Sequence, residues 1–105
     1  MNYRKYRNTP TTVDGIRFDS MKEANRYAEL KLLQKEGLIA GLLVHPPFSI
    51  KVNGKYVCTY VGDFHYLDVK TGKEVLEDTK GVKTPVYQLK KKLMLAVHGI
   101  TIVEV

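Results

Sequence analysis

Two sharply bounded helix patterns enclose a β-rich stretch, and this arrangement constrains the fold of the 105-residue chain more than any other feature. The first helix is expected over about Met21 to Glu36. Ser20 supplies its N-cap, Glu23 completes a Ser-x-x-Glu capping box, and Gly37 stands where helices commonly end. A capped helix at this point separates a short N-terminal part from the rest of the chain.

The second helix pattern opens at Thr84-Pro85, an N-cap followed by proline at the first helical position, and closes at Gly99. Its periodicity predicts a buried apolar stripe of five residues. The stripe comprises Val86, Leu89, Leu93, Ala96 and Val97.

Apolar segments of high β propensity lie between and after the helices, separated by turn signals. Asn53-Gly54 predicts a tight hairpin, Thr71-Gly72 a second one, and Pro46-Pro47 favour an extended chain before them. The expected strands cover Leu42–His45, Phe48–Val52, Tyr56–Val69, Glu74–Lys80 and Ile100–Val105. A helical crossover should set the last strand parallel to Glu74–Lys80. The expected fold class is α/β, an α+β-like mixed sheet with helical cover in the order α-β-β-β-α-β.

The length suits one compact domain, and we place that domain at residues 13–105. Asp14-Gly15 predicts a short hairpin at its start, over Val13 to Phe18. Residues 1–12 carry little apolar content and are expected to form a flexible basic arm.

The charge balance favours a polyanionic partner. Seventeen Lys and Arg against eleven Asp and Glu give a net charge of +6, which suits phosphate binding and slightly favours a nucleic-acid partner over a charge that only keeps the protein soluble. No apolar stretch is long enough for a membrane span or a signal peptide. The lone Cys58 fits a reducing compartment, so we expect a cytoplasmic protein.

Several acidic residues gather in the middle of this basic chain. Asp78 and Lys80 are two residues apart on an expected strand, so they share a face. A tight turn at Thr71-Gly72 would place His65 opposite Asp78 and Asp63 opposite Lys80. Two carboxylates on one face are costly to bury without a cation, and such oxygen ligands suit Mg²⁺ or Mn²⁺. Lys80 could then orient an attacking water for phosphodiester hydrolysis.

These residues carry a resemblance to a known family. Gly62-Asp63 followed by Asp78-Thr79-Lys80, in the order α-β-β-β-α-β, resembles the PD-(D/E)XK nuclease superfamily with its restriction-endonuclease-like core. The segments Thr12–Ser20, Tyr60–Phe64 and Glu77–Gly81 are similar to small phage-encoded members. The resemblance covers nearly the whole chain from Thr11 to Val105.

The resemblance implies a Mg²⁺-dependent (or Mn²⁺-dependent) endonuclease acting on DNA, with branched or recombination intermediates as candidate substrates. Asp63 and Asp78 match the metal-binding acids, Lys80 the catalytic lysine, and Glu23 an acid that many members place on the first helix. The Thr79 carbonyl is a further expected metal ligand. Gly62 departs from the proline that usually precedes the first aspartate.

Some alternatives stay open at this point. Glu23 is either the capping-box acid or a metal ligand, or both. Lys83 is well placed to meet phosphate, and Arg4, Lys5 and Arg7 could grip a DNA backbone, whereas Lys90 to Lys92 fan out around a helix and read as solvated. A homodimer is one way for so small a body to hold a duplex. The rival functions are a noncatalytic nucleic-acid-binding module of the same fold and a small interaction protein.

Overall fold

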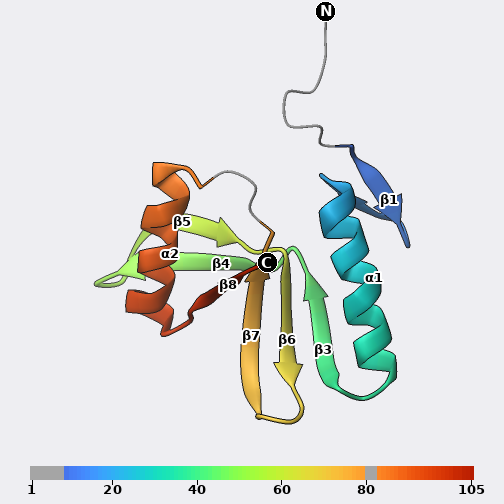
Figure 1. Ribbon diagram of the computed structural model, residues 1–105. Helices are drawn as coiled ribbons and strands as arrows, with labels where there is room; N and C mark the ends of the chain where they lie inside the picture. Colours follow the sequence, from blue (N-terminus) through green and yellow to red (C-terminus); the bar gives the residue numbers. More distant parts are fainter. Residues whose placement is uncertain (1–8, 80–82) are drawn as a thin grey trace, which may run out of the picture.

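The computed structural model describes residues 9–79 and 83–105 as a mixed α/β domain in which two helices pack against sheets (Figure 1). The strands are β1 (Thr11–Val13), β2 (Ile16–Phe18), β3 (Ile39–Val44), β4 (Pro47–Val52), β5 (Lys55–Val61), β6 (Phe64–Asp68), β7 (Lys73–Asp78) and β8 (Ile102–Glu104). The helices are α1 (Met21–Lys35) and α2 (Pro85–His98). The sequence therefore predicted the class of fold correctly.

The central sheet has four strands in the order β3-β6-β7-β8. The first three strands are antiparallel, and β8 runs parallel to β7 after the crossover through α2, as expected. Along the chain, the β4–β5 hairpin lies between β3 and β6, but it forms a separate two-stranded sheet. Without this hairpin the order from α1 onward is α-β-β-β-α-β.

Both helices begin and end where their caps predict. The Ser20 side chain accepts a hydrogen bond from the Glu23 amide at the start of α1, and Thr84 accepts one from the Tyr87 amide at the start of α2. Gly99 ends α2 with φ of 68°, in the left-handed region that glycine adopts without strain. At the N-terminal side, β1 begins at Thr11, two residues before the expected domain boundary.

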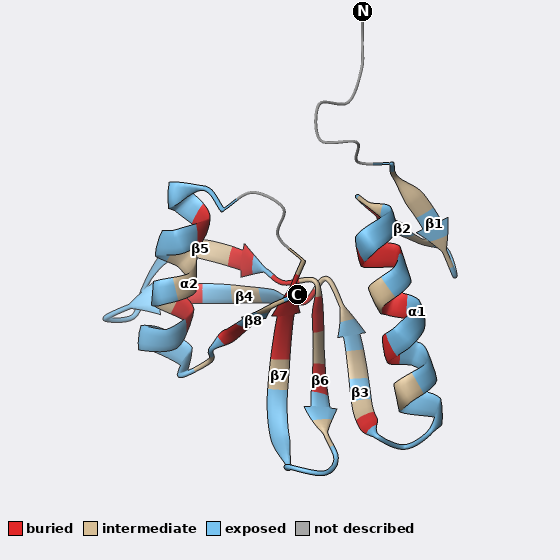
Figure 2. Cartoon of the chain, viewed as in Figure 1, coloured by how far each residue is buried: buried red, intermediate tan, exposed pale blue. Residues whose placement is uncertain are grey.

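The sheet separates two hydrophobic clusters, one under each helix, and the buried positions follow this division (Figure 2). The α1 cluster comprises Phe18, Ala24, Tyr27, Leu30, Ile39, Phe64 and Tyr66. The α2 cluster comprises Ile50, Tyr60, Leu76, Tyr87, Met94 and Ile102. Successive residues of β7 therefore face different clusters, a division that positions the acidic groups described below.

The expected turn at Thr71-Gly72 is wrong by two residues in register. Asp68, not Lys70, pairs with Lys73, and His65 lies opposite Leu76. The Asp68 carboxylate accepts a hydrogen bond from the Lys70 amide, which lengthens the loop. Because the error is an even number of residues, it leaves each side chain on its expected face.

Two other expectations for the strands are also corrected. The segment Tyr56–Val69 is not one strand, because the chain breaks at Gly62-Asp63 between β5 and β6. His45 is not extended before Pro46; its φ is 53°, in the left-handed region.

The expected apolar stripe of α2 is wrong except at Leu93, which packs against the α2 cluster. Val86 and Leu89 are exposed, and the helix buries Tyr87 and Met94 instead. The helix is rotated because the large aromatic ring of Tyr87 contributes more buried area than a valine. Among the described residues, no helix is long and apolar enough to cross a membrane.

Candidate metal centre

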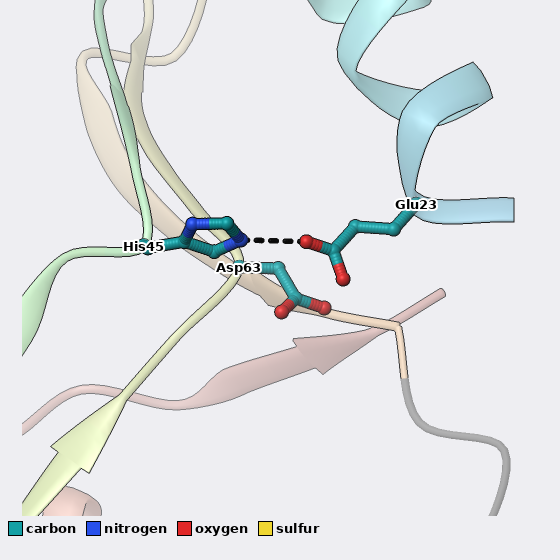
Figure 3. A group of neighbouring side chains, drawn as sticks. All are labelled: Glu23, His45 and Asp63. Atoms are coloured by element: carbon teal, nitrogen blue, oxygen red, sulfur yellow. Dashed lines mark hydrogen bonds and ion pairs between the residues drawn. The ribbon is translucent and has the colours of Figure 1, made fainter. Parts of the chain in front are cut away.

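Three side chains from different elements converge at one end of the central sheet: Glu23, His45 and Asp63. One potential ligand atom from each residue lies within 4.8 Å of those from the other two. Figure 3 shows the imidazole and the two carboxylates turned toward one another, with the Glu23–His45 contact drawn as a dashed line. The group brings together two of the predicted site residues and one that the sequence analysis did not select.

Glu23 comes from the first turn of α1 and is 6% exposed. Its backbone amide completes the cap with Ser20, while its carboxylate Oε1 lies 2.7 Å from His45 Nε2. Burial raises the pKa of Glu23 above its ordinary value; the hydrogen bond with His45 opposes this shift and the charge of Asp63 adds to it. The amide thus contributes to the cap while the carboxylate lies in the cluster, and the roles of Glu23 as capping-box acid and as metal ligand both stay predictions.

His45 follows β3 and precedes the buried Pro46. Its left-handed backbone is held by a hydrogen bond of 2.9 Å from its amide to the Asp63 carbonyl, and by the 3.1 Å bond from the Gly62 amide to the Pro46 carbonyl. The imidazole packs beside the Phe18 ring, with the ring centroids 5.7 Å apart. These contacts aim Nε2 at Glu23 and leave the side chain 37% exposed.

Asp63 occupies the break between β5 and β6. Its amide donates to the Glu77 carbonyl at 3.0 Å, which fixes the backbone beside the end of β7. Its Oδ2 accepts hydrogen bonds from the Thr79 amide and, at 2.6 Å, from the Thr79 hydroxyl. Charge on this carboxylate is therefore stabilised by two donors, while its position keeps it beside Glu23.

Asp78 lies at the end of β7 and is 1% exposed. Its carboxylate accepts a hydrogen bond from the hydroxyl of Tyr60, a member of the α2 cluster. Burial, and then the Asp78 hydrogen bond, raise the pKa of Tyr60 well above its ordinary value, which keeps the phenol protonated as the donor. Asp78 is therefore adjacent in sequence to Thr79, the partner of Asp63, but its carboxylate contacts the α2 side.

The remaining predicted residues fall in three groups. Lys80 and the arm residues Arg4, Lys5 and Arg7 lie outside the described residues. Lys83 is half-exposed and its Nζ lies 3.0 Å from the Glu104 carboxylate, which a DNA phosphate would have to displace. His65 is partly buried beside Phe48 and lies 3.8 Å from Glu74.

The lysines of α2 are not uniformly solvated, contrary to the sequence-based interpretation. Lys90 Nζ donates to the Thr59 carbonyl at 2.9 Å, and Lys91 Nζ lies 3.3 Å from the Glu104 carboxylate. Their long side chains therefore reach two different strands, β5 and β8.

Two hollows border this end of the sheet. The first, of about 300 Å³, is lined by Lys22, Arg26, Glu29, Thr79 and Val105. The second, of about 290 Å³, is lined by Thr59, Tyr60, Val61, Thr84, Val86, Tyr87 and Lys90. Thr79 lines the first and Tyr60 the second, so the hydrogen-bond partners of Asp63 and Asp78 each border a hollow that contains a basic side chain.

His45 is the residue of the centre that sequence analysis missed. Its only local signal is the following Pro46, which favours an extended chain, and the left-handed turn depends on hydrogen bonds to Gly62 and Asp63 far along the sequence. A single histidine in an apolar, β-rich segment gives no spacing pattern that would mark it as a ligand.

The geometry describes a small mixed α/β domain with a histidine–carboxylate cluster at one end of its sheet. The chain belongs to the family described as protein of unknown function (DUF1064), whose model matches residues 3–99. No curated protein and no solved structure matches the chain.

Proposed function

We propose that this protein is a metal-dependent DNA endonuclease with a restriction-endonuclease-like core, which uses Mg²⁺ or Mn²⁺. The observation that carries the proposal is the convergence of Glu23, His45 and Asp63, within 4.8 Å of one another, next to the end of β7. The order α-β-β-β-α-β around the sheet, with the β4–β5 hairpin as an insertion, supports the resemblance to the PD-(D/E)XK nucleases.

The donor set fits a divalent cation. Glu23 and Asp63 supply carboxylate oxygens, which are the usual ligands of Mg²⁺ and Mn²⁺. Glu23 is buried beside a second carboxylate, an arrangement that disfavours its charge and that a cation would stabilise. A divalent ion held there would lower the pKa of a coordinated water and neutralise charge on a phosphate.

The chain's own groups divide the remaining tasks. Thr79 holds Asp63 in place through its amide and hydroxyl. Tyr60 holds the Asp78 carboxylate at the end of β7, from where the chain continues to Lys80. In the proposal Lys80, which matches the catalytic lysine of the nucleases, orients the attacking water.

The charge distribution suits an extended polyanion. Lys22 and Arg26 line the hollow at Thr79, and Lys90 lines the hollow at Tyr60. A DNA strand passing across the end of the sheet would meet cations on both sides of the acidic cluster, and the net charge of +6 favours its approach.

Cleavage of labelled linear, single-stranded and branched DNA with Mg²⁺ or Mn²⁺, beside an EDTA control, tests the proposal. Asp63→Asn, Asp78→Asn and Lys80→Ala should each abolish cutting while DNA binding is retained. Glu74→Gln is the matched control, because Glu74 lies on β7 as Asp78 does but its side chain is 72% exposed. This variant should cut as the unmodified protein does.

Cutting that requires both the metal and Lys80 would support the nuclease, and the preferred substrate would identify the DNA structure recognised. Salt-sensitive binding with no cutting on any substrate or metal would instead support the noncatalytic module. Cutting that persists in Lys80→Ala and Asp63→Asn would overturn the assignment of the site.

A further inference from the structure

We infer that His45 is a direct metal ligand through Nε2 and that the Glu23–His45–Asp63 centre therefore favours first-row transition ions over Mg²⁺. The inference rests on the proposed metal site but not on DNA cleavage. It adds a nitrogen donor, and with it a metal preference, to a centre that the acidic residues alone would make suitable for Mg²⁺.

The position of the imidazole supports a ligand role. Nε2 is the ring atom that faces Glu23, at 2.7 Å from Oε1, and the Asp63 carboxylate completes the group (Figure 3). In an octahedral site with ligands about 2.1 Å from the ion, neighbouring ligand atoms lie about 3 Å apart and opposite ones about 4.2 Å apart. The Nε2–Oε1 separation of 2.7 Å is about 0.3 Å below the value for neighbouring ligands, and the limit of 4.8 Å within which all three atoms lie is about 0.6 Å above the value for opposite ligands.

The exposure of the side chains also suits an ion site, because Glu23 is buried and His45 is accessible to solvent. The Glu23 side chain is 8% exposed, whereas the His45 side chain is 37% exposed. An ion can thus reach the carboxylates from the imidazole side. The ring does not swing freely at this opening, because the His45 backbone is hydrogen-bonded to Asp63 and the ring packs beside Phe18 with the two ring planes tilted by 54°.

The donor chemistry sets the preference. Imidazole nitrogen is a good ligand for first-row transition ions, whereas Mg²⁺ prefers oxygen ligands and retains several waters. Among the divalent first-row transition ions, Mn²⁺ generally binds a given site most weakly. If the site prefers even Mn²⁺ over Mg²⁺, it is expected to prefer the other ions of the series as well, so Mn²⁺ gives the most demanding test.

The test measures Mn²⁺ binding to the full chain without DNA, by electron paramagnetic resonance, and Mg²⁺ binding by competition. We expect Mn²⁺ to bind at least about tenfold more tightly than Mg²⁺. Bound Mn²⁺ should also show magnetic coupling to a nitrogen nucleus, which a histidine that only orients Glu23 would not produce.

His45→Asn is the informative variant, because asparagine tolerates a left-handed backbone and replaces the nitrogen donor by an amide oxygen. It should lose the nitrogen coupling and reduce the Mn²⁺/Mg²⁺ affinity ratio by about tenfold or more, mainly through weaker Mn²⁺ binding. His98→Asn, whose imidazole contacts the Ser49 carbonyl, should leave both unchanged. Metal-free thermal unfolding verifies that each variant is folded.

Equal losses of Mn²⁺ and Mg²⁺ affinity in His45→Asn, or bound Mn²⁺ without nitrogen coupling, would overturn the inference while leaving the nuclease proposal intact. Nitrogen-coupled Mn²⁺ that depends on His45, in a protein that cuts no DNA, would support the metal site and overturn the nuclease. Failure of the unmodified protein to bind either ion would overturn both.

Discussion

Gly62 lies where a side chain would collide with the core. A Cβ added to it would stand 2.6 Å from Leu76 Cδ1, and Leu76 is 1% exposed. We expect Gly62→Ala to lower the free energy of unfolding by about 1–3 kcal/mol, the usual cost of overpacking, measured by urea denaturation. The close approach explains why glycine stands before Asp63, and proline at this position would also remove the amide that donates to the Pro46 carbonyl.

Shortening the neighbour provides the control for this substitution. Leu76→Val combined with Gly62→Ala should cost less than the sum of the two single changes, because the shorter side chain makes room for the new methyl group. If the losses of stability caused by the two single substitutions are strictly additive, the clash in Gly62→Ala is not with Leu76.

At the candidate site, the sequence identifies those residues whose identity follows from local pattern. Asp63 and Asp78 are predicted from their positions along expected strands, whereas Glu23 and the Thr79 carbonyl are expected only as parts of the nuclease-like site that the resemblance implies. The grouping could not be predicted, because the break at Gly62-Asp63 turns the Asp63 carboxylate toward α1 while Asp78 contacts Tyr60. A single irregular residue in a strand decides this, and no periodicity signals it.

At the scale of the elements, α1 and β7 are joined by an ion pair in which the Glu77 carboxylate is buried and the Arg26 side chain is partly exposed. The Arg26 guanidinium donates two hydrogen bonds to Glu77, at 2.8 and 2.6 Å, and the Tyr66 hydroxyl donates a third. Because the Glu77 side chain is 1% exposed, Arg26→Ala would leave a buried carboxylate without its cation. We expect a loss of about 3–5 kcal/mol in the free energy of unfolding, measured by urea denaturation.

Neutralising the carboxylate distinguishes this explanation from simple loss of packing. Arg26→Ala combined with Glu77→Gln should be more stable than Arg26→Ala alone, because no uncompensated charge is then buried. If the second substitution lowers stability further, the arginine contributes mainly through its packed side chain.

Helix α2 is held to β8 by a polar network around Glu104. Its carboxylate accepts a hydrogen bond from the Tyr87 hydroxyl at 2.7 Å and pairs with Lys83 and Lys91. The bond from Tyr87, then that from Lys83, lowers the pKa of Glu104 from its ordinary value of 4.5 to about 2. Stability from a carboxyl group with a lowered pKa is present above its ordinary pKa and is lost as the pH falls toward the lowered one.

The melting temperature of Glu104→Gln should therefore lie below that of the unmodified protein at pH 7. This difference should shrink as the pH falls below about 4.5. Thermal unfolding followed by circular dichroism from pH 7 to pH 3 measures it. A difference in melting temperature that stays constant from pH 7 to pH 3 would show that Glu104 stabilises the fold through packing rather than through its charge.

The elements themselves could be predicted where their signals are local. Caps and turn glycines gave the bounds of both helices and the Asn53-Gly54 hairpin. The register at Thr71-Gly72 was missed because the Asp68 side chain lengthens the turn, and the buried face of α2 because long-range packing selects Tyr87 and Met94. Such contacts arise from tertiary structure, which sequence periodicity does not encode.

At the scale of the whole molecule, a net positive charge is combined with a small group of buried acidic side chains. A chain with net charge +6 carries its buried acids, Glu23, Glu77 and Asp78, at or near one end of the sheet. This contrast favours a partner that is attracted over a distance by the basic surface and placed locally by a cation at the acids. In the proposed function, DNA is that partner.

The contributions of the basic arm can be separated from those of net charge by the salt dependence of DNA binding. If Arg4, Lys5 and Arg7 each neutralise one phosphate, replacing all three by alanine should reduce the slope of log affinity against log salt by about 2.7. The measurement uses fluorescence anisotropy without divalent ions, in the Asp78→Asn background. The matched control removes three exposed lysines, Lys51, Lys55 and Lys70, and loses the same charge. Equal changes in slope for the two triple variants would show that DNA responds to overall charge, whereas a larger change for the arm would make residues 4–7 part of the DNA-binding surface.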